Sequence, residues 1–209
     1  MKRAIVMAIS VILALAVAAP IASGQPASQG QGLKALTEAW WTWALTQPSP
    51  MEGDYKGGQK CEGEFVEGVF FLAGTSPLVQ TEGDAERTCT VPADTALFFP
   101  VINAFCTEDE PDYPQCARDP VNTALAGEPY ATRDGADLSF SRITTGEFPL
   151  ILPKPNIFRL PAGPYEHLAL SDGLWVYLPQ GLEPGEYTLQ FGGDLGDFPL
   201  NITYNLIVV

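Results

Sequence analysis

The pattern of apolar and polar residues changes once along the chain, from a helical period to a strand period. Between residues 33 and 46 the apolar side chains recur at helical spacing, which predicts a short N-terminal amphipathic helix. The residues that share its apolar face are Leu33, Leu36, Trp40, Trp43 and Ala44. Gln47-Pro48 should end this helix, because the residue before a proline avoids helical backbone angles.

After Ser49 the sequence breaks into short apolar or alternating runs that Pro, Gly and Asp separate. Runs such as ALFFPVIN (96–103) and GLWVYLP (173–179) have the length and residue types of strands. The last run alternates, so that Asn201, Thr203 and Asn205 share one face and apolar residues the other. We therefore predict a mainly β protein, a single β-sandwich of jelly-roll or immunoglobulin-like type. A second short helix is expected at 120–126, with Asp119 as its N-cap.

The first residues have the features of a secretory signal. Lys2 and Arg3 precede an apolar run over 4–19, which is shorter than the roughly 20 residues of a spanning helix. Small residues at Ala22 and Gly24 suit a signal peptidase. We predict a signal peptide over 1–24, a disordered lead-in over 25–32 and a single β-rich domain over 33–209. The alternative is an uncleaved N-terminal anchor. Cleavage would leave no integral membrane segment and place the protein outside the cell, in the periplasm or in the cell envelope.

Charge narrows the range of partners. The chain has 11 Lys and Arg residues against 25 Asp and Glu residues, a net charge of −14. Loss of Lys2 and Arg3 with the signal peptide leaves nine basic residues against the same 25 acidic ones, a charge of −16. Such a field repels nucleic-acid phosphates and anionic membrane surfaces, so neither is expected as a partner. Carbohydrate and envelope or extracellular proteins stay candidates.

Four cysteines lie in the expected mature chain, an even number that indicates two disulfides in an exported protein. Of the three connectivities we favour Cys61–Cys89 and Cys106–Cys116. Zinc is not expected, because the single histidine is His167 and no cysteine pair has C-x-x-C spacing.

An acidic stretch lies between the last two cysteines, in FCTEDEPDYPQC (105–116). Its carboxylates, Glu108, Asp109, Glu110 and Asp112, are the candidate metal ligands. Calcium is the candidate cofactor, because this hard cation takes about six to eight oxygen ligands. The stretch lacks the D-x-D-x-D-G spacing of an EF-hand, so a braced structural loop is the first interpretation and a cation site the second.

Motifs for catalysis are sparse. The chain contains no G-x-S-x-G, no H-E-x-x-H and no phosphate-binding glycine loop. Glu62 and Glu64 share one face of a predicted strand, where they either serve as a glycosidase pair or guard a strand edge. We expect a non-catalytic protein with a binding or structural role. The alternatives are a carbohydrate-active hydrolase that uses Glu and Asp, and a calcium-dependent carbohydrate-binding module.

Three residues are the candidate ligand-binding positions. Trp41 lies off the apolar stripe of the first helix, Asn103 follows the strand ALFFPVIN, and Trp175 alternates with Tyr177 on one strand face. An exposed aromatic ring would stack on a sugar, and Asn103 would line a pocket. Core packing for the two tryptophans and loop capping for Asn103 are the commoner alternatives.

Three blocks together resemble a family of secreted bacterial proteins. They are the Trp-rich helix with its FLAG-like strand (40–75), RTCTVPADTALFFPVINAFC (87–106) and SDGLWVYLPQGLEPGEYTLQFGG (171–193). They occur in the family's order, and the likeness spans most of residues 40–208. The resemblance implies a signal peptide, disulfides and one β-rich domain, and it implies no activity, cofactor or catalytic residue. The family's Asn-Pro is replaced here by Ser49-Pro50.

Overall fold

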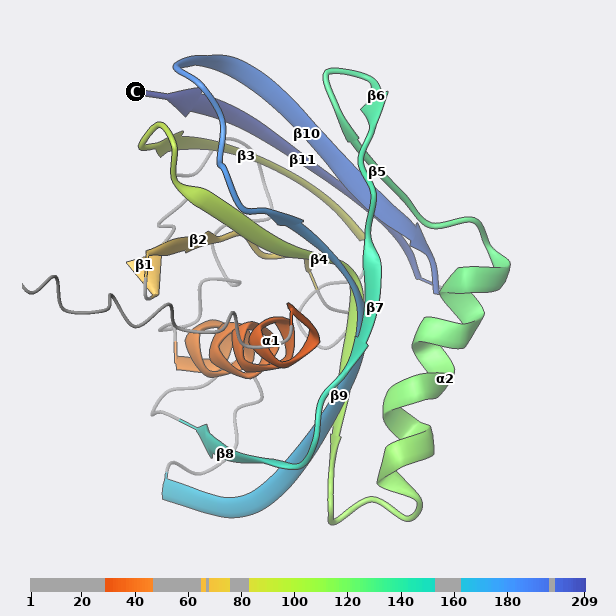
Figure 1. Cartoon of the computed structure of the whole chain (residues 1–209). Helices are drawn as coiled ribbons and strands as arrows, with labels where there is room; N and C mark the ends of the chain where they lie inside the picture. Colours follow the sequence, from red (N-terminus) through yellow and green to blue (C-terminus); the bar gives the residue numbers. More distant parts are fainter. Residues whose placement is uncertain (1–28, 47–64, 67, 76–82, 153–162, 196–197) are drawn as a thin grey trace, which may run out of the picture.

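A computed structural model describes residues 29–46, 65–66, 68–75, 83–152, 163–195 and 198–209. Two helices and eleven strands form in this part of the chain (Figure 1). In chain order they are α1 (Gln29–Thr46), β1 (Phe65–Val66), β2 (Val69–Phe71), β3 (Gly83–Val91), β4 (Ala96–Thr107), α2 (Tyr113–Ala126), β5 (Tyr130–Arg133), β6 (Ala136–Asp137), β7 (Ser141–Thr144), β8 (Phe148–Leu152), β9 (Gly163–Leu178), β10 (Gly185–Asp194) and β11 (Pro199–Val208). The expectation of a mainly β protein is confirmed.

The strands form two sheets. One has six strands in the order β1-β2-β4-β9-β7, with β8 also paired to β9, and the other has five in the order β3-β11-β10-β5-β6. The pairs β2–β4 and β3–β11 are parallel, and the remaining pairs are antiparallel. The longest strands, β4 and β9, run through both the upper and the lower part of the view in Figure 1. They are neighbours within the six-stranded sheet, and α2 packs against both of them.

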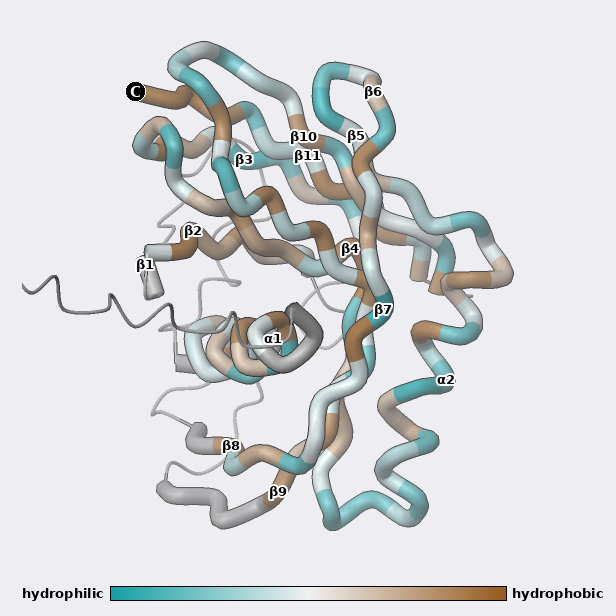
Figure 2. The backbone as a smooth tube through the Cα atoms, in the orientation of Figure 1, coloured by the Kyte–Doolittle hydropathy of each residue, from teal (hydrophilic) through white to brown (hydrophobic). Residues whose placement is uncertain are grey.

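The main core lies between the two sheets. Apolar residues of β4 and β9 contact the inward residues of β10 and β11, and the Phe99 and Phe191 rings are 4.8 Å apart. The alternation of buried and exposed residues along β3 and β11 follows from the two-residue period of a strand. Figure 2 colours the backbone of these strands by the hydropathy of each residue. The five-stranded sheet therefore has one face in the core and one in solvent.

A second core lies on the other face of the six-stranded sheet, under α1. All four tryptophans of the chain belong to it. Trp175 of β9 stacks on Phe98 of β4 at 4.8 Å and meets the edge of Trp40 at 5.2 Å. α1 ends at Thr46, directly before the predicted stop, and begins at Gln29, inside the expected lead-in.

α2 corrects the prediction of a helix confined to 120–126. The helix begins at Tyr113, its N-cap is Asp112 rather than Asp119, and Pro120 lies inside it. Proline removes one helical hydrogen bond, which normally favours a helix end at this point. Here the longer helix packs against β4 and β9, and tertiary burial outweighs that local cost. Its buried residues are Ala117, Val121 and Ala124.

The predicted disulfide Cys106–Cys116 is confirmed. It joins the end of β4 to the first turn of α2, with the two Cα atoms 6.0 Å apart. Cys89 of β3 is also disulfide-bonded, and its predicted partner Cys61 lies outside the described residues. So do the expected signal peptide and the pair Glu62 and Glu64. Within the described ranges, no helix combines the length and apolarity that crossing a membrane requires.

Candidate functional site

The three candidate ligand-binding residues lie around one stretch of β9, residues 171–175. Trp41 donates its indole N–H to the Ser171 hydroxyl at 2.6 Å, and Asn103 stands opposite Gly173 in the β4–β9 register. β4 continues to Thr107, so Asn103 lies within a strand and does not cap a loop. Trp41 is 7% exposed and Trp175 is 2% exposed. Neither ring presents a solvent-facing surface on which a sugar could stack.

Gly173 explains how Trp175 fits. A Cβ at this position would lie 2.5 Å from the Trp175 indole nitrogen and 3.0 Å from both the Asn103 Cβ and the Ile102 carbonyl oxygen. Only glycine leaves room for the indole there. Trp175 Nε1 and Asn103 Nδ2 are buried and have no hydrogen-bond partner among the described residues, an arrangement that costs about 1–3 kcal/mol per group. This stretch of β9 is therefore tightly packed rather than open to a ligand.

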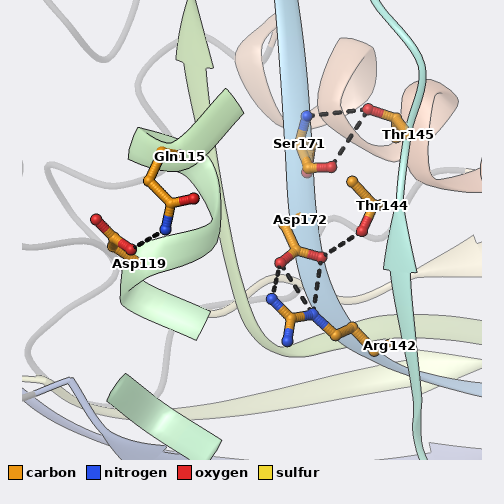
Figure 3. Close-up of polar contacts among 7 residues, drawn as sticks. All are labelled: Gln115, Asp119, Arg142, Thr144, Thr145, Ser171 and Asp172. Carbon is orange, nitrogen blue, oxygen red and sulfur yellow. Dashed lines mark hydrogen bonds and ion pairs between the residues drawn. The ribbon is translucent and has the colours of Figure 1, made fainter. Parts of the chain in front are cut away.

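A buried ion pair occupies the adjacent position of β9 (Figure 3). Asp172 is fully buried, and Arg142 of β7 donates to its Oδ2 from Nη2 at 2.5 Å and from Nε at 3.0 Å. Nε also reaches Oδ1 at 3.2 Å, and the Thr144 hydroxyl donates to Oδ1 at 2.9 Å. The hydrogen bond to Asp172 is the largest cause that raises the pKa of Arg142, and it outweighs burial, which lowers it. Both carboxylate oxygens of Asp172 are thus engaged, and the group is not placed to act as a base or nucleophile.

Ser171, the residue before Asp172 in β9, is held by Thr145, which directly follows β7. The Ser171 backbone N–H donates to the Thr145 hydroxyl at 2.9 Å (Figure 3). Its carbonyl also accepts from the Thr145 backbone N–H at 2.9 Å. A nucleophilic serine needs a base that removes its proton. The partner of the Ser171 hydroxyl is instead the Trp41 indole, which can only donate. Ser171 serves to attach α1 to the sheet.

The acidic stretch forms the turn between β4 and α2, and its four carboxylates are exposed. Glu108 accepts a hydrogen bond from the Leu168 N–H at 3.4 Å, and Asp112 adopts a left-handed conformation as the N-cap of α2. Among the described residues, no group of three or more His, Cys, Asp or Glu side chains is arranged to hold a metal ion. The geometry agrees with the braced loop, and calcium binding stays a prediction.

The outer face of the five-stranded sheet is a surface that the sequence did not single out. We call the outward side chains of β3, β11, β10 and β5 the polar face. Asn201 of β11 donates to Asp84 of β3 at 2.9 Å and accepts from the Tyr130 hydroxyl of β5 at 3.1 Å. Asn205 of β11 donates to Glu86 of β3 at 2.9 Å. Only the alternation of Asn and Thr in the last strand pointed toward this surface, because strand order decides the remaining contacts.

Comparison with known proteins assigns neither a family nor a function to this chain. No family model matches the chain, and no curated protein matches it significantly. One chain from the structure of PbICP-C in complex with falcipain-2 is similar over 66% of this chain and 98% of that chain, with 12% identity and a TM-score of 0.25. A likeness at this level carries no argument about fold or function.

Proposed function

We propose that this chain is an exported, disulfide-stabilised protein that acts outside the cytoplasm by binding, without catalysing a reaction. The observation that carries the proposal is the contrast between its inner and outer polar groups. Asp172, the one carboxylate buried in the described part of the chain, is engaged by Arg142 and Thr144. The polar face, in contrast, holds hydrogen-bonded side chains that are open to solvent.

The N-terminal pattern and the cysteines support the compartment. Disulfides persist in oxidising compartments, and the chain has one between β4 and α2. We further propose the second bridge Cys61–Cys89, cleavage after Gly24, and a sandwich of jelly-roll or immunoglobulin-like type for the two sheets. The acidic mature chain excludes nucleic acid from the proposed partners and leaves carbohydrate or an extracellular protein.

Export can be tested with the full chain in a bacterial host that has a general secretory pathway. We expect a processed form in the periplasm or medium whose N-terminus is Gln25. We also expect four cysteines that react with iodoacetamide only after reduction. The control variant Leu13→Arg/Leu15→Arg interrupts the apolar run and should keep the chain in the cytoplasm. A wild-type chain that stays unprocessed in the cytoplasm with reactive thiols would refute the proposal.

Absence of catalysis needs a separate measurement. The exported protein should release no reducing sugar from neutral polysaccharides during prolonged incubation. A glycosidase would need two carboxyl groups about 5 to 9.5 Å apart across the scissile bond. Release that is lost in Glu62→Gln or Glu64→Gln would make the hydrolase alternative correct.

A further inference from the structure

One row of the polar face crosses four strands. The registers place Asp84 of β3 opposite Asn201 of β11, Asn201 opposite Gly192 of β10, and Gly192 opposite Tyr130 of β5. Tyr130 and Asn201 are therefore two strands apart, a distance of about 10 Å at the usual strand spacing. Their side chains nevertheless meet in a hydrogen bond of 3.1 Å. The Tyr130 side chain must lie along the sheet, across Gly192.

Gly192 lies between Tyr130 and Asn201 in the register and packs closely against the backbone of β11. A Cβ built there would fall 1.7 Å from the Leu200 carbonyl oxygen, so no side chain can occupy the position. Gly192 itself is buried, whereas Tyr130 is 37% exposed. The Tyr130 side chain spans the position of Gly192 to reach Asn201, and part of its surface is open to solvent. Its hydroxyl is held at the far end, so the ring is anchored before any ligand arrives.

The polar groups beside the ring have fixed orientations. The Asn201 oxygen accepts from Tyr130, and its amide nitrogen donates to Asp84 at 2.9 Å, so both ends of the amide are assigned. The Asp84 carboxylate keeps further acceptor positions toward solvent. Gln190 of β10 is exposed in the next row, opposite Thr132 of β5. Burial raises the pKa of Tyr130, and Asp84 raises it further, so the phenol stays a donor at neutral pH.

The charge of the polar face and its small number of apolar side chains limit the class of ligand that it can bind. The outward side chains of β3, β11, β10 and β5 include no Lys or Arg, and Asp84, Glu86 and Glu186 are among them. Phosphate, sulfate and uronate groups would find no counter-charge there. The large exposed apolar side chains on this face are Tyr130 and Ile207, too few for the buried centre of a protein interface. A neutral sugar, with an apolar C–H face and hydroxyls on its rim, matches a ring bordered by amides and a carboxylate.

We propose that the row formed by Asp84, Asn201, Gly192 and Tyr130 binds a neutral polysaccharide. The Tyr130 ring is the stacking surface, and Asn201 and Asp84 contact the hydroxyls beside it. This inference rests on the proposed function and names the ligand class of its binding surface. Trp41 and Trp175 are the aromatic residues that the sequence predicts for this role, but both are buried in the core.

The test is affinity electrophoresis of the exported protein in native gels that contain β-1,3-glucan, galactomannan or arabinoxylan, with polygalacturonate as the anionic comparison. We expect at least one neutral polysaccharide to retard the protein and polygalacturonate to leave its mobility unchanged. Tyr130→Ala should weaken retardation at least tenfold, and Tyr130→Phe should keep the ring and weaken it less. Ile207→Ala removes the other large apolar side chain of the same face, is 41% exposed in the wild type, and serves as the matched control.

Each outcome decides the inference. Retardation lost in Tyr130→Ala and kept in Ile207→Ala, with both melting temperatures near that of the wild type, supports it. No retardation in any neutral gel overturns it, as does equal weakening by both alanine variants or equal binding of polygalacturonate. An exported, processed chain that binds none of the three overturns the carbohydrate inference alone. A chain that binds through Tyr130 but is never exported overturns the proposed function alone.

Discussion

Replacing Arg142 with alanine isolates the contribution of the ion pair between β7 and β9. The change removes the guanidinium contacts at 2.5, 3.0 and 3.2 Å and leaves Asp172 with the Thr144 hydroxyl. Breaking a buried pair by removing one partner costs about 3–5 kcal/mol, because the remaining charge is buried without compensation. The Arg142 side chain is 36% exposed while Asp172 is 0% exposed. Water can therefore partly replace the guanidinium, and we expect a loss of about 2–3 kcal/mol.

A double-mutant cycle separates the pair from other effects of the substitution. Arg142→Ala, Asp172→Asn and the double variant are unfolded in urea with disulfides intact and followed by tryptophan fluorescence. Asn keeps the shape of Asp172 and removes its charge. We expect a coupling free energy of about 2 kcal/mol. Arg118→Ala, on α2, is the control and should change the free energy of unfolding by less than about 0.5 kcal/mol.

Two results would refute this reasoning. A coupling free energy within about 0.5 kcal/mol of zero would mean that the pair behaves like an exposed salt bridge. A loss in Arg118→Ala as large as that in Arg142→Ala would mean that the effect does not come from the contact with Asp172. Either result would also remove the argument that Asp172 is committed to a structural role.

Three further predictions follow from contacts elsewhere in the structure. Gly173→Ala should destabilise the fold by about 1–3 kcal/mol through overpacking, and displacement of Trp175 should shift the tryptophan emission to the red. Replacing both cysteines of the bridge between β4 and α2 with alanine should cost about 2.8 kcal/mol by loop entropy, seen as a melting temperature several degrees lower. Asp84→Asn should lower the pKa of Tyr130 while leaving it above its ordinary value of 10.0, since burial is the larger cause; a ¹³C-tyrosine NMR titration measures this. Because the folded pKa is raised, the stability that Tyr130 contributes is complete below pH 10.0 and is lost as pH rises through the folded value.

The elements that the sequence predicts well are those with a strong local period. The Trp-rich helix, the alternating last strand and the short disulfide are examples, because each depends on residues close together in the chain. α2 is the counterexample. Pro120 marks a helix start by local rules, and the helix extends back to Tyr113 because contacts with β4 and β9 stabilise the earlier turns.

The candidate site shows the same difference between features that depend on nearby residues and features that depend on tertiary contacts. Trp175 is a candidate binding residue by sequence, but its burial depends on α1 covering the sheet, which periodicity does not reveal. Arg142 and Asp172 belong to separate runs of the sequence and form no motif there. They become an ion pair only because β7 lies beside β9.

Sequence alone thus determined the mainly β character and the acidic charge of the chain, and it favoured the pairing of two nearby cysteines. Tertiary structure alone decided which polar side chains meet on a common face. Tyr130 and Asn201 are 71 residues apart, and Asn201 and Asp84 are 117 apart, yet they form one hydrogen-bonded row. The physical reason is that strand order and register are set by burial of both sheets against a shared core, and this choice depends on the whole chain at once.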